Sequence, residues 1–177
     1  GYSVRVIDDL RGGRLANLAH VHPGPDLEFH EVDICTLKAD SKIFTEADLV
    51  LHFAGIGDIV PSVQHPVDYL ETNVMGTVKV LEASRQAGVR RFVYAASSSC
   101  YGAHPDLPTS ESSPIVTEYP YALSKYLGEQ AAFHWMKVYG LSVNAIRIFN
   151  AYGPRSRTSG AYGAVFGVFL RQKLEGA

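Results

Sequence analysis

The sequence predicts an α/β protein: a doubly wound parallel sheet with helices on both faces, in one domain of 177 residues. Three observations lead to this fold class. Near-continuous apolar runs end in small or acidic residues, which is typical of parallel strands buried on both faces. Stretches with helical periodicity follow these runs, so that strand and helix alternate along the chain. Glycine follows two of the helical stretches, where it commonly ends a helix.

Five segments are predicted strands, because each shows alternation or a buried apolar run. They span residues 3–8, 27–33, 47–55, 90–99 and 141–150. Three segments are predicted helices, at residues 67–86, 121–139 and 162–175, with Gly88 and Gly140 closing the first two. The sequence contains no internal repeat, low-complexity tract or linker. We therefore expect one domain over residues 1–177.

The composition excludes several classes of protein. Hydrophobic residues make up 46% and charged residues 19%, with a formal net charge of −2. This balance offers no basic surface for nucleic acid or a membrane. No apolar run approaches the roughly 20 residues that span a bilayer, and no secretory signal opens the sequence, so a cytoplasmic protein is expected. Cys35 and Cys100 are expected to be buried, reduced thiols, and the histidine spacing predicts no metal site.

Two acids end the first predicted strand. Asp8 and Asp9 stand where a dinucleotide-binding unit places the acid that binds the adenosine ribose. The glycine-rich phosphate turn of such a unit should lie about 20 residues earlier, and only seven residues precede Asp8. The segment 11–14 (RGGR) fits a loop around the ribose. Solvated turn acids are the alternative reading of this pair.

Other predicted strands end at the same edge of the sheet. Asp33 and Ile34 follow the second strand, where a carboxylate suits the adenine amino group. The small residues in 53–55 allow close approach of a cofactor to the backbone. Asn73 is an unfavourable residue inside a helix, and its alternative reading is an exposed surface amide. Because ligands of open α/β sheets bind at the carboxyl ends of strands, these segments predict one crevice.

The fourth strand and the helix after it contain the candidate catalytic groups. Ser97, Ser98 and Ser99 end the strand, where they would cap a turn or surround a sugar hydroxyl. Tyr121 and Lys125 are four residues apart, so they share one helix face. A phenol ionises near pH 10, and a cation a few Å away favours the phenolate. Packing is the alternative explanation for this spacing.

The order of these motifs resembles the extended short-chain dehydrogenase/reductase family, the NAD-dependent sugar epimerases and dehydratases. The resemblance covers essentially all 177 residues and rests on VIDDL, VDI, HFAG, TNVMGTVKVLEA, VYAASSSCYG, YALSK and RIFNAYGPR, in that order. It implies a Rossmann-like sheet and NAD as cofactor. It also implies that Ser97, Tyr121 and Lys125 are catalytic, and that Ser98, Ser99, Tyr121 and Asn150 bind substrate.

The resemblance further implies a set of cofactor-binding residues. They are Asp8, Asp9, Leu10, Arg11, Gly12, Gly13, Asp33, Ile34, Phe53, Ala54, Gly55, Ile56, Gly57, Asn73, Ser97, Tyr121, Lys125 and Phe149.

Within this family the residues after the catalytic serine separate the reactions. Sugar 4,6-dehydratases have an Asp-Glu pair there, whereas this chain has Ser98 and Ser99, which disfavours dehydration. The segments SSSCYG and PRSRTSGAYGAVF look most like UDP-hexose and UDP-N-acetylhexosamine 4-epimerases. A nucleotide-sugar dehydrogenase or reductase, a dehydratase, and a non-catalytic dinucleotide sensor remain alternatives. The resemblance also implies a homodimer of the complete protein, paired through two helices.

The two ends of the sequence are expected to depart from the family. Gly1 resembles the residue that terminates a helix, and the sequence stops as another helix finishes, as in the middle of a longer protein. The Rossmann-like sheet is therefore expected to be incomplete at its N-terminus, without the central strand beside residues 3–8 and without the C-terminal substrate lobe. We expect these 177 residues alone to bind NAD weakly and to be marginally stable or aggregate.

Overall fold

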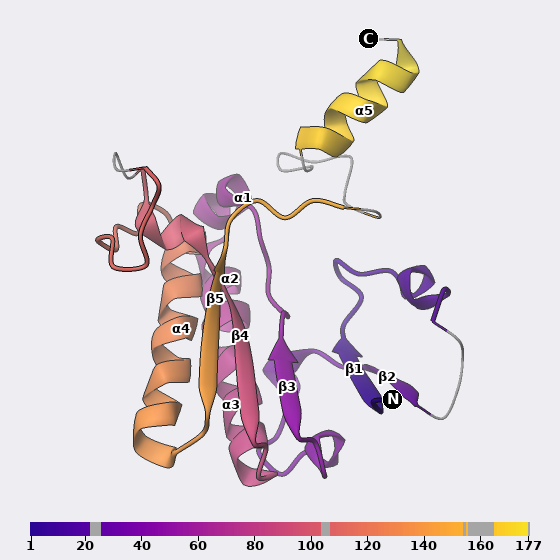
Figure 1. Cartoon of the computed structure of the whole chain (residues 1–177), viewed down its shortest axis with the longest axis vertical. Coiled ribbons are helices and arrows are strands. Elements are labelled where there is room, and N and C mark those ends of the chain that lie inside the picture. The colour runs from indigo at the N-terminus through magenta and orange to yellow at the C-terminus, as the bar shows by residue number, and fades with distance from the viewer. Residues whose placement is uncertain (22–25, 104–106, 154, 156–164, 177) are drawn as a thin grey trace.

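The computed structural model describes residues 1–21, 26–103, 107–153, 155 and 165–176 (Figure 1). Every strand in this part of the chain runs parallel to its neighbour. The strands are β1 (Val4–Asp8), β2 (Leu27–Glu31), β3 (Leu49–His52), β4 (Arg91–Ser97) and β5 (Val143–Ile148). All of the predicted strands are confirmed, each somewhat shorter than expected.

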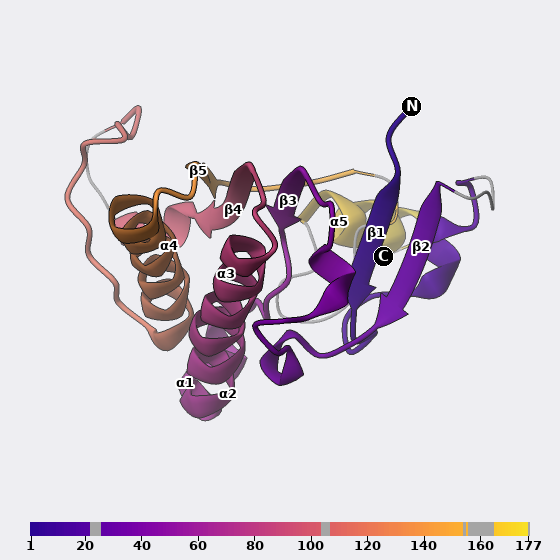
Figure 2. The same ribbon diagram turned by 90° about the horizontal axis from the view of Figure 1, so that it is seen from below.

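The strands form two sheets instead of one. β1 pairs with β2, and β3, β4 and β5 form the second sheet in that order. β1 lies beside β3 in two perpendicular views, although no ladder joins the two strands (Figures 1 and 2). This gap in strand pairing lies beside residues 3–8, where the sequence predicts a missing central strand. One edge of β1 and one edge of β3 have no partner strand among the described residues.

The predicted helices are also present. Residues 66–86 form a continuous helical run, and the predicted 121–139 helix begins one residue earlier, behind an extended Tyr119 with a proline in its first turn. Gly140 ends it in the left-handed conformation, with φ of +74°. Residues 162–164 of the third prediction lie outside the described residues. The longer helical elements are α1 (Ile59–Gln64), which the sequence did not predict, α2 (Pro66–Leu70), the π-helix η4 (Glu71–Gly76), α3 (Thr77–Gln86), α4 (Pro120–Tyr139) and α5 (Val165–Glu175). Short 3-10 helices span η1 (Leu15–Leu18), η2 (Ile34–Thr36), η3 (Lys42–Phe44) and η5 (Ser98–Tyr101).

The core lies between the three-stranded sheet and the helices α3 and α4 (Figure 2). Phe92 and Tyr94 alternate along β4 and are fully buried on the face toward these helices. Leu81 from α3 and Ala132 from α4 are buried with them. Since successive strand residues point to opposite faces, this alternation fixes which face of β4 meets the helices.

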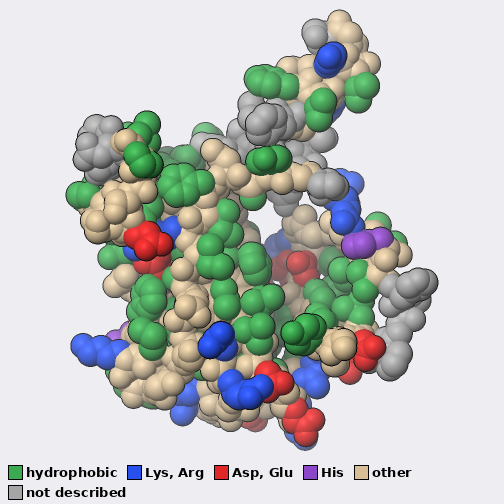
Figure 3. Space-filling model, in the orientation of Figure 1, with side chains coloured by type: hydrophobic (Ala, Val, Ile, Leu, Met, Phe, Trp, Pro, Cys, Tyr) green, Lys and Arg blue, Asp and Glu red, His purple; other side chains and the backbone are tan. Residues whose placement is uncertain are grey.

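The opposite face of the same sheet is open. Leu49 and Leu51 of β3 are about half exposed, as is Ile146 of β5. Hydrophobic side chains gather over this part of the molecule in the space-filling view (Figure 3). The parallel sheet and its Rossmann-like class are confirmed, whereas the described helices cover only one face of it. α5 lies beyond the end of the sheet (Figure 1).

We expect the 177-residue chain to self-associate in solution. Unpaired strand edges and a contiguous apolar face both favour association with further copies. Sedimentation velocity should detect species larger than the monomer, and an environment-sensitive dye should bind. Leu51→Lys, on the open face, should reduce both signals. A monomeric chain that binds no dye would contradict this expectation.

Candidate active site

The carboxyl ends of β3, β4 and β5 enclose a cavity of about 300 Å³. Its wall includes the turn after β3, the last residues of β4, and the first turns of α4. The lining residues are Phe53, Gly55, Ile56, Gly57, Ala95, Ala96, Ser97, Tyr121, Lys125, Ile148, Phe149 and Ala151. The predicted crevice at the strand ends is thus present, and it contains all three residues predicted to be catalytic.

Ser97 and Tyr121 face each other across this cavity. Ser97 ends β4 and caps the short 3-10 helix η5 (Ser98–Tyr101), where its hydroxyl accepts a hydrogen bond from the Ser99 amide at 3.2 Å. The Tyr121 hydroxyl donates to the Ser97 oxygen at 3.5 Å, at the outer limit of a hydrogen bond. A substrate oxygen between the two hydroxyls would contact both.

Lys125 lies one helical turn after Tyr121 and is 7% exposed. Its ammonium nitrogen lies 4.7 Å from the centre of the Tyr94 ring, so a cation–π contact replaces part of its lost hydration. Among the described residues, no carboxylate forms an ion pair with it. Burial lowers the pKa of Lys125 to about 8, since the charged form is the one that loses solvation.

Asn73 fixes the turn after β3 from inside η4. The side chain is 1% exposed, so the alternative reading as a surface amide is wrong. Its oxygen accepts from the Ile56 amide at 2.8 Å, and its nitrogen donates to the Ile56 carbonyl and the Ser124 hydroxyl, both at 2.9 Å. A Cβ atom on Gly55 would lie 2.8 Å from the Asn73 oxygen, so a larger residue would displace the amide.

Asn73→Ala should lower the free energy of unfolding of the complete protein by about 2 kcal/mol, because it leaves the partly buried backbone N–H and C=O of Ile56 without their side-chain partner. It should also weaken NAD binding, since the 55–57 turn lines the cavity. Denaturant unfolding and calorimetric titration measure the two effects. Asn144→Ala, at an exposed position of β5, is the matched control. Equal results for both variants would contradict this role of Asn73.

The buried His52, which was not among the predicted site residues, is linked to the backbone of Asn73 through Thr77. The Thr77 hydroxyl donates to the Asn73 carbonyl at 2.7 Å and lies 2.8 Å from Nε2 of His52. Because the hydroxyl hydrogen is used, Nε2 must be the donor in the second bond. Burial, with a contribution from Lys125, lowers the pKa of His52 to about 3, so this ring is neutral. The only sequence indication was its place inside a buried strand.

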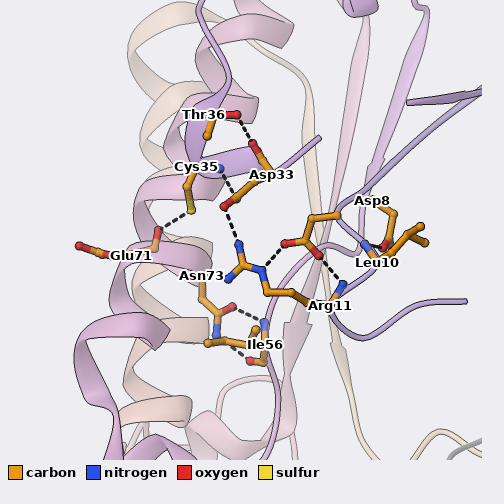
Figure 4. A network of polar contacts seen from close by, with 10 residues as sticks. Asp8, Leu10, Arg11, Asp33, Cys35, Thr36, Ile56, Glu71 and Asn73 are labelled. Atoms are coloured by element: carbon orange, nitrogen blue, oxygen red, sulfur yellow. Dashed lines mark hydrogen bonds and ion pairs between the residues drawn. The ribbon is translucent and has the colours of Figure 1, made fainter. Parts of the chain in front are cut away.

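The predicted ribose acid occupies a tight turn after β1. An oxygen of Asp8 accepts from the Leu10 amide at 2.7 Å (Figure 4). A Cβ atom at Gly13 would lie 2.9 Å from the same oxygen, so glycine permits the turn to fold around the carboxylate.

Arg11 joins the ends of β1 and β2. Its guanidinium pairs with Asp9 at 2.6 Å and with Asp33 at 2.5 Å (Figure 4). The Cys35 amide, at 2.8 Å, and Arg11 together lower the pKa of Asp33 below its usual value. The sequence placed Arg11 and both acids in one site but gave no indication of these ion pairs.

Several predicted residues lie outside the cavity. Asn150, Ser98 and Ser99 do not line it, and Ala54 packs against the core. The Ile34 side chain is buried and contacts Gly76, so only its backbone remains for a ligand. Cys100 is buried as expected, whereas Cys35 is partly exposed. Four lining residues were missed: Ala95, Ala96, Ile148 and Ala151. The small size of the three alanines was the one sequence feature that could have indicated them, and Ile148 had no such indication.

The described residues contain no cluster of three or more side chains suited to a metal ion. In the same part of the chain, none of the helices has the length and apolar character needed to cross a bilayer.

A parallel sheet with ligand-sized space at the carboxyl ends of its strands defines the Rossmann-like class of α/β proteins. The chain belongs to the NAD dependent epimerase/dehydratase family, which it matches over residues 1–177. It is 34% identical to a UDP-glucose 4-epimerase of Mycolicibacterium smegmatis, covering 99% of this chain and 56% of that protein. The chain thus spans about half the length of the curated relatives it matches. The resemblance derived from the motifs is confirmed.

Two solved structures illustrate the similarity. A UDP-N-acetylglucosamine 4-epimerase from Methanobrevibacter ruminantium, in complex with UDP-N-acetylmuramic acid, superposes with a TM-score of 0.91 at 29% identity. The superposition covers 98% of this chain and 56% of that chain. A dTDP-glucose 4,6-dehydratase from Streptomyces venezuelae, with NAD bound, gives 0.89 at 32% identity, over 99% of this chain and 53% of that one.

NAD is the cofactor of this family, and the cavity suits it. Gly55, Ala95 and Ala96 leave room along one wall, and Phe149 offers an aromatic side chain. Among the polar lining groups, Lys125 is a buried ammonium without a carboxylate partner in the described structure. A buried cation of this kind suits hydroxyl oxygens, which the family's cofactor provides.

Proposed function

We propose that the complete protein catalyses the NAD-dependent 4-epimerisation of a nucleotide-activated sugar, a UDP-hexose or UDP-N-acetylhexosamine. The observation that carries this proposal is the meeting of Tyr121, Ser97 and Lys125 in one cavity at the strand ends. The 4-epimerases among the relatives support the choice of reaction. When bound, NAD would accept the hydride from C4 and return it to the opposite face of the 4-keto sugar, so that the reaction involves no net oxidation.

The cofactor would be held along the carboxyl ends of all five strands. Asp8 would accept hydrogen bonds from the adenosine ribose, and Asp33 would lie near the adenine amino group. Segment 53–57, fixed by Asn73, would border the middle of the cofactor. Lys125 would donate to the hydroxyls of the nicotinamide ribose, and Phe149 would contact the nicotinamide ring.

Each catalytic residue has a separate role in moving the proton. Tyr121, as phenolate, removes the proton from the sugar 4-hydroxyl, and Ser97 hydrogen-bonds the same oxygen. Lys125 favours the phenolate form through its charge. The 4-keto sugar then rotates in the pocket so that its other face meets the cofactor. Tyr121 returns the proton to the 4-oxygen as the opposite epimer forms. Substrate positioning by Ser98, Ser99 and Asn150 is part of the proposal.

One alternative has a specific observation in its favour. The S. venezuelae structure is a 4,6-dehydratase at 32% identity, so the family match alone admits dehydration. That reaction needs an acid and a base at the sugar after oxidation, whereas the hydroxyls of Ser98 and Ser99 follow Ser97 here. Epimerisation requires no such pair.

One incubation separates the candidate activities. The complete protein is mixed with UDP-glucose or UDP-N-acetylglucosamine and catalytic NAD, and products are identified by NMR while absorbance at 340 nm is followed. The 4-epimer without accumulation of reduced cofactor is the expected result. Net reduction at 340 nm would show a dehydrogenase, and a 4-keto-6-deoxy product would show a dehydratase. Absence of turnover with tight NAD binding would favour a dinucleotide sensor.

We also propose that the complete protein is a homodimer paired through α4 and the helical run before it. α4 exposes Leu123 and Leu127, and that run exposes Val67 and Met75. Light scattering after size-exclusion chromatography tests the assembly. Leu127→Arg should yield a monomer if these side chains form the interface.

A further inference from the structure

A largely buried ion pair joins α4 to β5, next along the strand to Ile148 of the cavity wall. Arg147 of β5 donates to both carboxylate oxygens of Glu129, from Nε at 2.9 Å and from Nη2 at 2.6 Å. Glu129 is only 2% exposed. This contact, together with a hydrogen bond to Tyr101, raises the pKa of Arg147 above its usual value. The fork-to-fork geometry allows little change in the relative position of the helix and the strand.

The third nitrogen of Arg147 reaches the segment that follows β4. Nη1 donates to the Tyr101 hydroxyl at 2.8 Å and to the Glu111 carbonyl at 3.3 Å. The guanidinium carbon also lies 4.9 Å from the centre of the Tyr101 ring. That ring stacks on Phe149, with ring centres 6.4 Å apart and 25° between planes. One guanidinium therefore contacts three segments: α4, η5 and the loop that contains Glu111.

Two of these segments, α4 and η5, carry or directly follow the proposed catalytic groups. η5 begins directly after Ser97, and α4 begins one residue before Tyr121. In the register of the sheet, Arg147 lies opposite Ala96, and its neighbour Ile148 lies opposite Ser97. Any shift of α4 relative to β4 and β5 would change the separation of the Tyr121 and Ser97 hydroxyls, which is already 3.5 Å.

The pair has a second consequence for Lys125. Glu129 follows Lys125 by one helical turn, at the spacing at which a carboxylate and an ammonium can pair. Arg147 occupies both oxygens of Glu129, so that carboxylate does not draw the Lys125 ammonium out of the cavity. The ammonium lies instead over the Tyr94 ring, at the wall of the cavity.

Stability alone does not account for this arrangement. A buried ion pair can often be replaced by apolar residues of similar volume without loss of stability, because desolvation offsets the attraction. What apolar residues cannot reproduce is a planar fork that fixes two carboxylate oxygens, a phenol and a carbonyl at once.

We propose that Arg147 is a positioning residue, which locks the helix of Tyr121 and Lys125 to the Ser97 turn and to the Tyr101–Phe149 stack. The inference rests on the proposed function for its effect on turnover, and on the contacts alone for its effect on local structure. Tyr101 and Glu129 act with Arg147 in this role.

The test compares Arg147→Lys with Arg85→Lys in the complete protein. Arg85 is the matched control because it too forms a two-point contact with a glutamate, Glu82, and lies over a tyrosine ring, Tyr139, on the outer surface of α3 and α4. Lysine keeps the charge and loses the fork. Arg147→Lys should lower kcat about tenfold or more, since misplacing reacting groups by roughly 1 Å costs up to about a hundredfold. NAD affinity should change less than about twofold, below 0.5 kcal/mol in binding.

Hydrogen exchange supplies a readout that does not depend on activity. Arg147→Lys should speed amide exchange in residues 98–101 and 107–118 while the middle of α4 keeps its protection. Tyr101→Phe, which keeps the ring stack and loses the hydroxyl contact, should show the same pattern at smaller amplitude. If Arg147→Lys does not fold, the exchange pattern and kcat of Tyr101→Phe decide whether the positioning role holds.

The outcomes separate this inference from the proposed function. A wild-type protein that does not epimerise would refute the function, and the exchange comparison would still test the lock. If Arg147→Lys or, failing that, Tyr101→Phe matches the Arg85→Lys control in exchange and in kcat, the positioning role is overturned. Uniform loss of protection throughout the protein, with unchanged kcat in the folded fraction, would likewise overturn it.

Discussion

Replacing Tyr121 by phenylalanine should lower the epimerase turnover of the complete protein by about 10²- to 10⁴-fold, the usual contribution of a positioned acid/base group. The substitution removes one oxygen atom. It leaves the edge-to-face contact of this ring with Tyr69, whose centre lies 6.3 Å away, so the first turns of α4 should keep their place. What is lost is the group that accepts the substrate proton beside Ser97.

The measurement is steady-state turnover together with NAD affinity, which should stay close to that of the wild type. Tyr119→Phe is the matched control, because Tyr119 precedes the same helix and does not line the cavity. It should retain nearly full activity. Unchanged turnover in Tyr121→Phe, or an equal loss in both variants, would remove Tyr121 from the catalytic role.

Lys125→Met should abolish most of the activity and at the same time stabilise the fold near neutral pH. Burial lowers the pKa of this lysine to about 8, which means that the folded protein holds its ammonium at a cost. Removing that charge should raise the free energy of unfolding at pH 7 by up to about 3 kcal/mol, less the lost contact with Tyr94. A gain of stability with a loss of activity is the pattern expected of a functional residue held in an unfavourable environment.

The pH dependence of this difference follows from proton linkage. Between the folded pKa of Lys125, about 8, and the higher pKa of an unfolded lysine, the unfolded state binds more protons. Wild-type stability therefore rises with pH across that interval, falls as pH drops from the unfolded pKa toward about 8, and is unaffected by this group's titration below that pH. The advantage of Lys125→Met should be largest at pH 7 and should shrink toward pH 10.

Urea unfolding of both proteins at several pH values measures the effect. Lys137→Met, in the last turn of the same helix, is the control, and it should change stability little at any pH. Lower stability of Lys125→Met at pH 7, or a difference that grows with pH, would contradict the assignment of a buried, destabilising ammonium.

The local pattern of the sequence was sufficient for the strands, for the long helices and for the three principal side chains of the site, whereas the short helix α1 (Ile59–Gln64) was missed. Period-two and buried apolar runs define strands wherever one face or both are covered, and β4 and β5 follow that rule. The spacing of Tyr121 and Lys125 placed both on one helix face. The strand end at Ser97 placed a hydroxyl at the edge where parallel sheets bind ligands.

What only the tertiary structure decided was the partner of each polar group. Asn73 lies in a π-helix, and its side-chain amide forms hydrogen bonds with Ile56 and Ser124. These residues are 17 and 51 positions away in the sequence. Arg147 and Glu129, 18 residues apart, read as separate charges in the sequence and form one buried pair in the fold. Hydrogen bonds between segments distant in sequence depend on how helices and strands pack together. The periodicity of a short segment contains no information about that packing.

The sequence by itself therefore determined an α/β chain with a tyrosine, a lysine and a serine at one edge of a parallel sheet. The packed fold decided the environment of those groups. It buried the Lys125 ammonium over the Tyr94 ring, kept the buried His52 neutral, and left β1 and β3 without a ladder between them among the described residues. The physical reason is that residue type and spacing fix which chemistry is possible, whereas burial and the charges brought near by folding fix the free energy of each charged state.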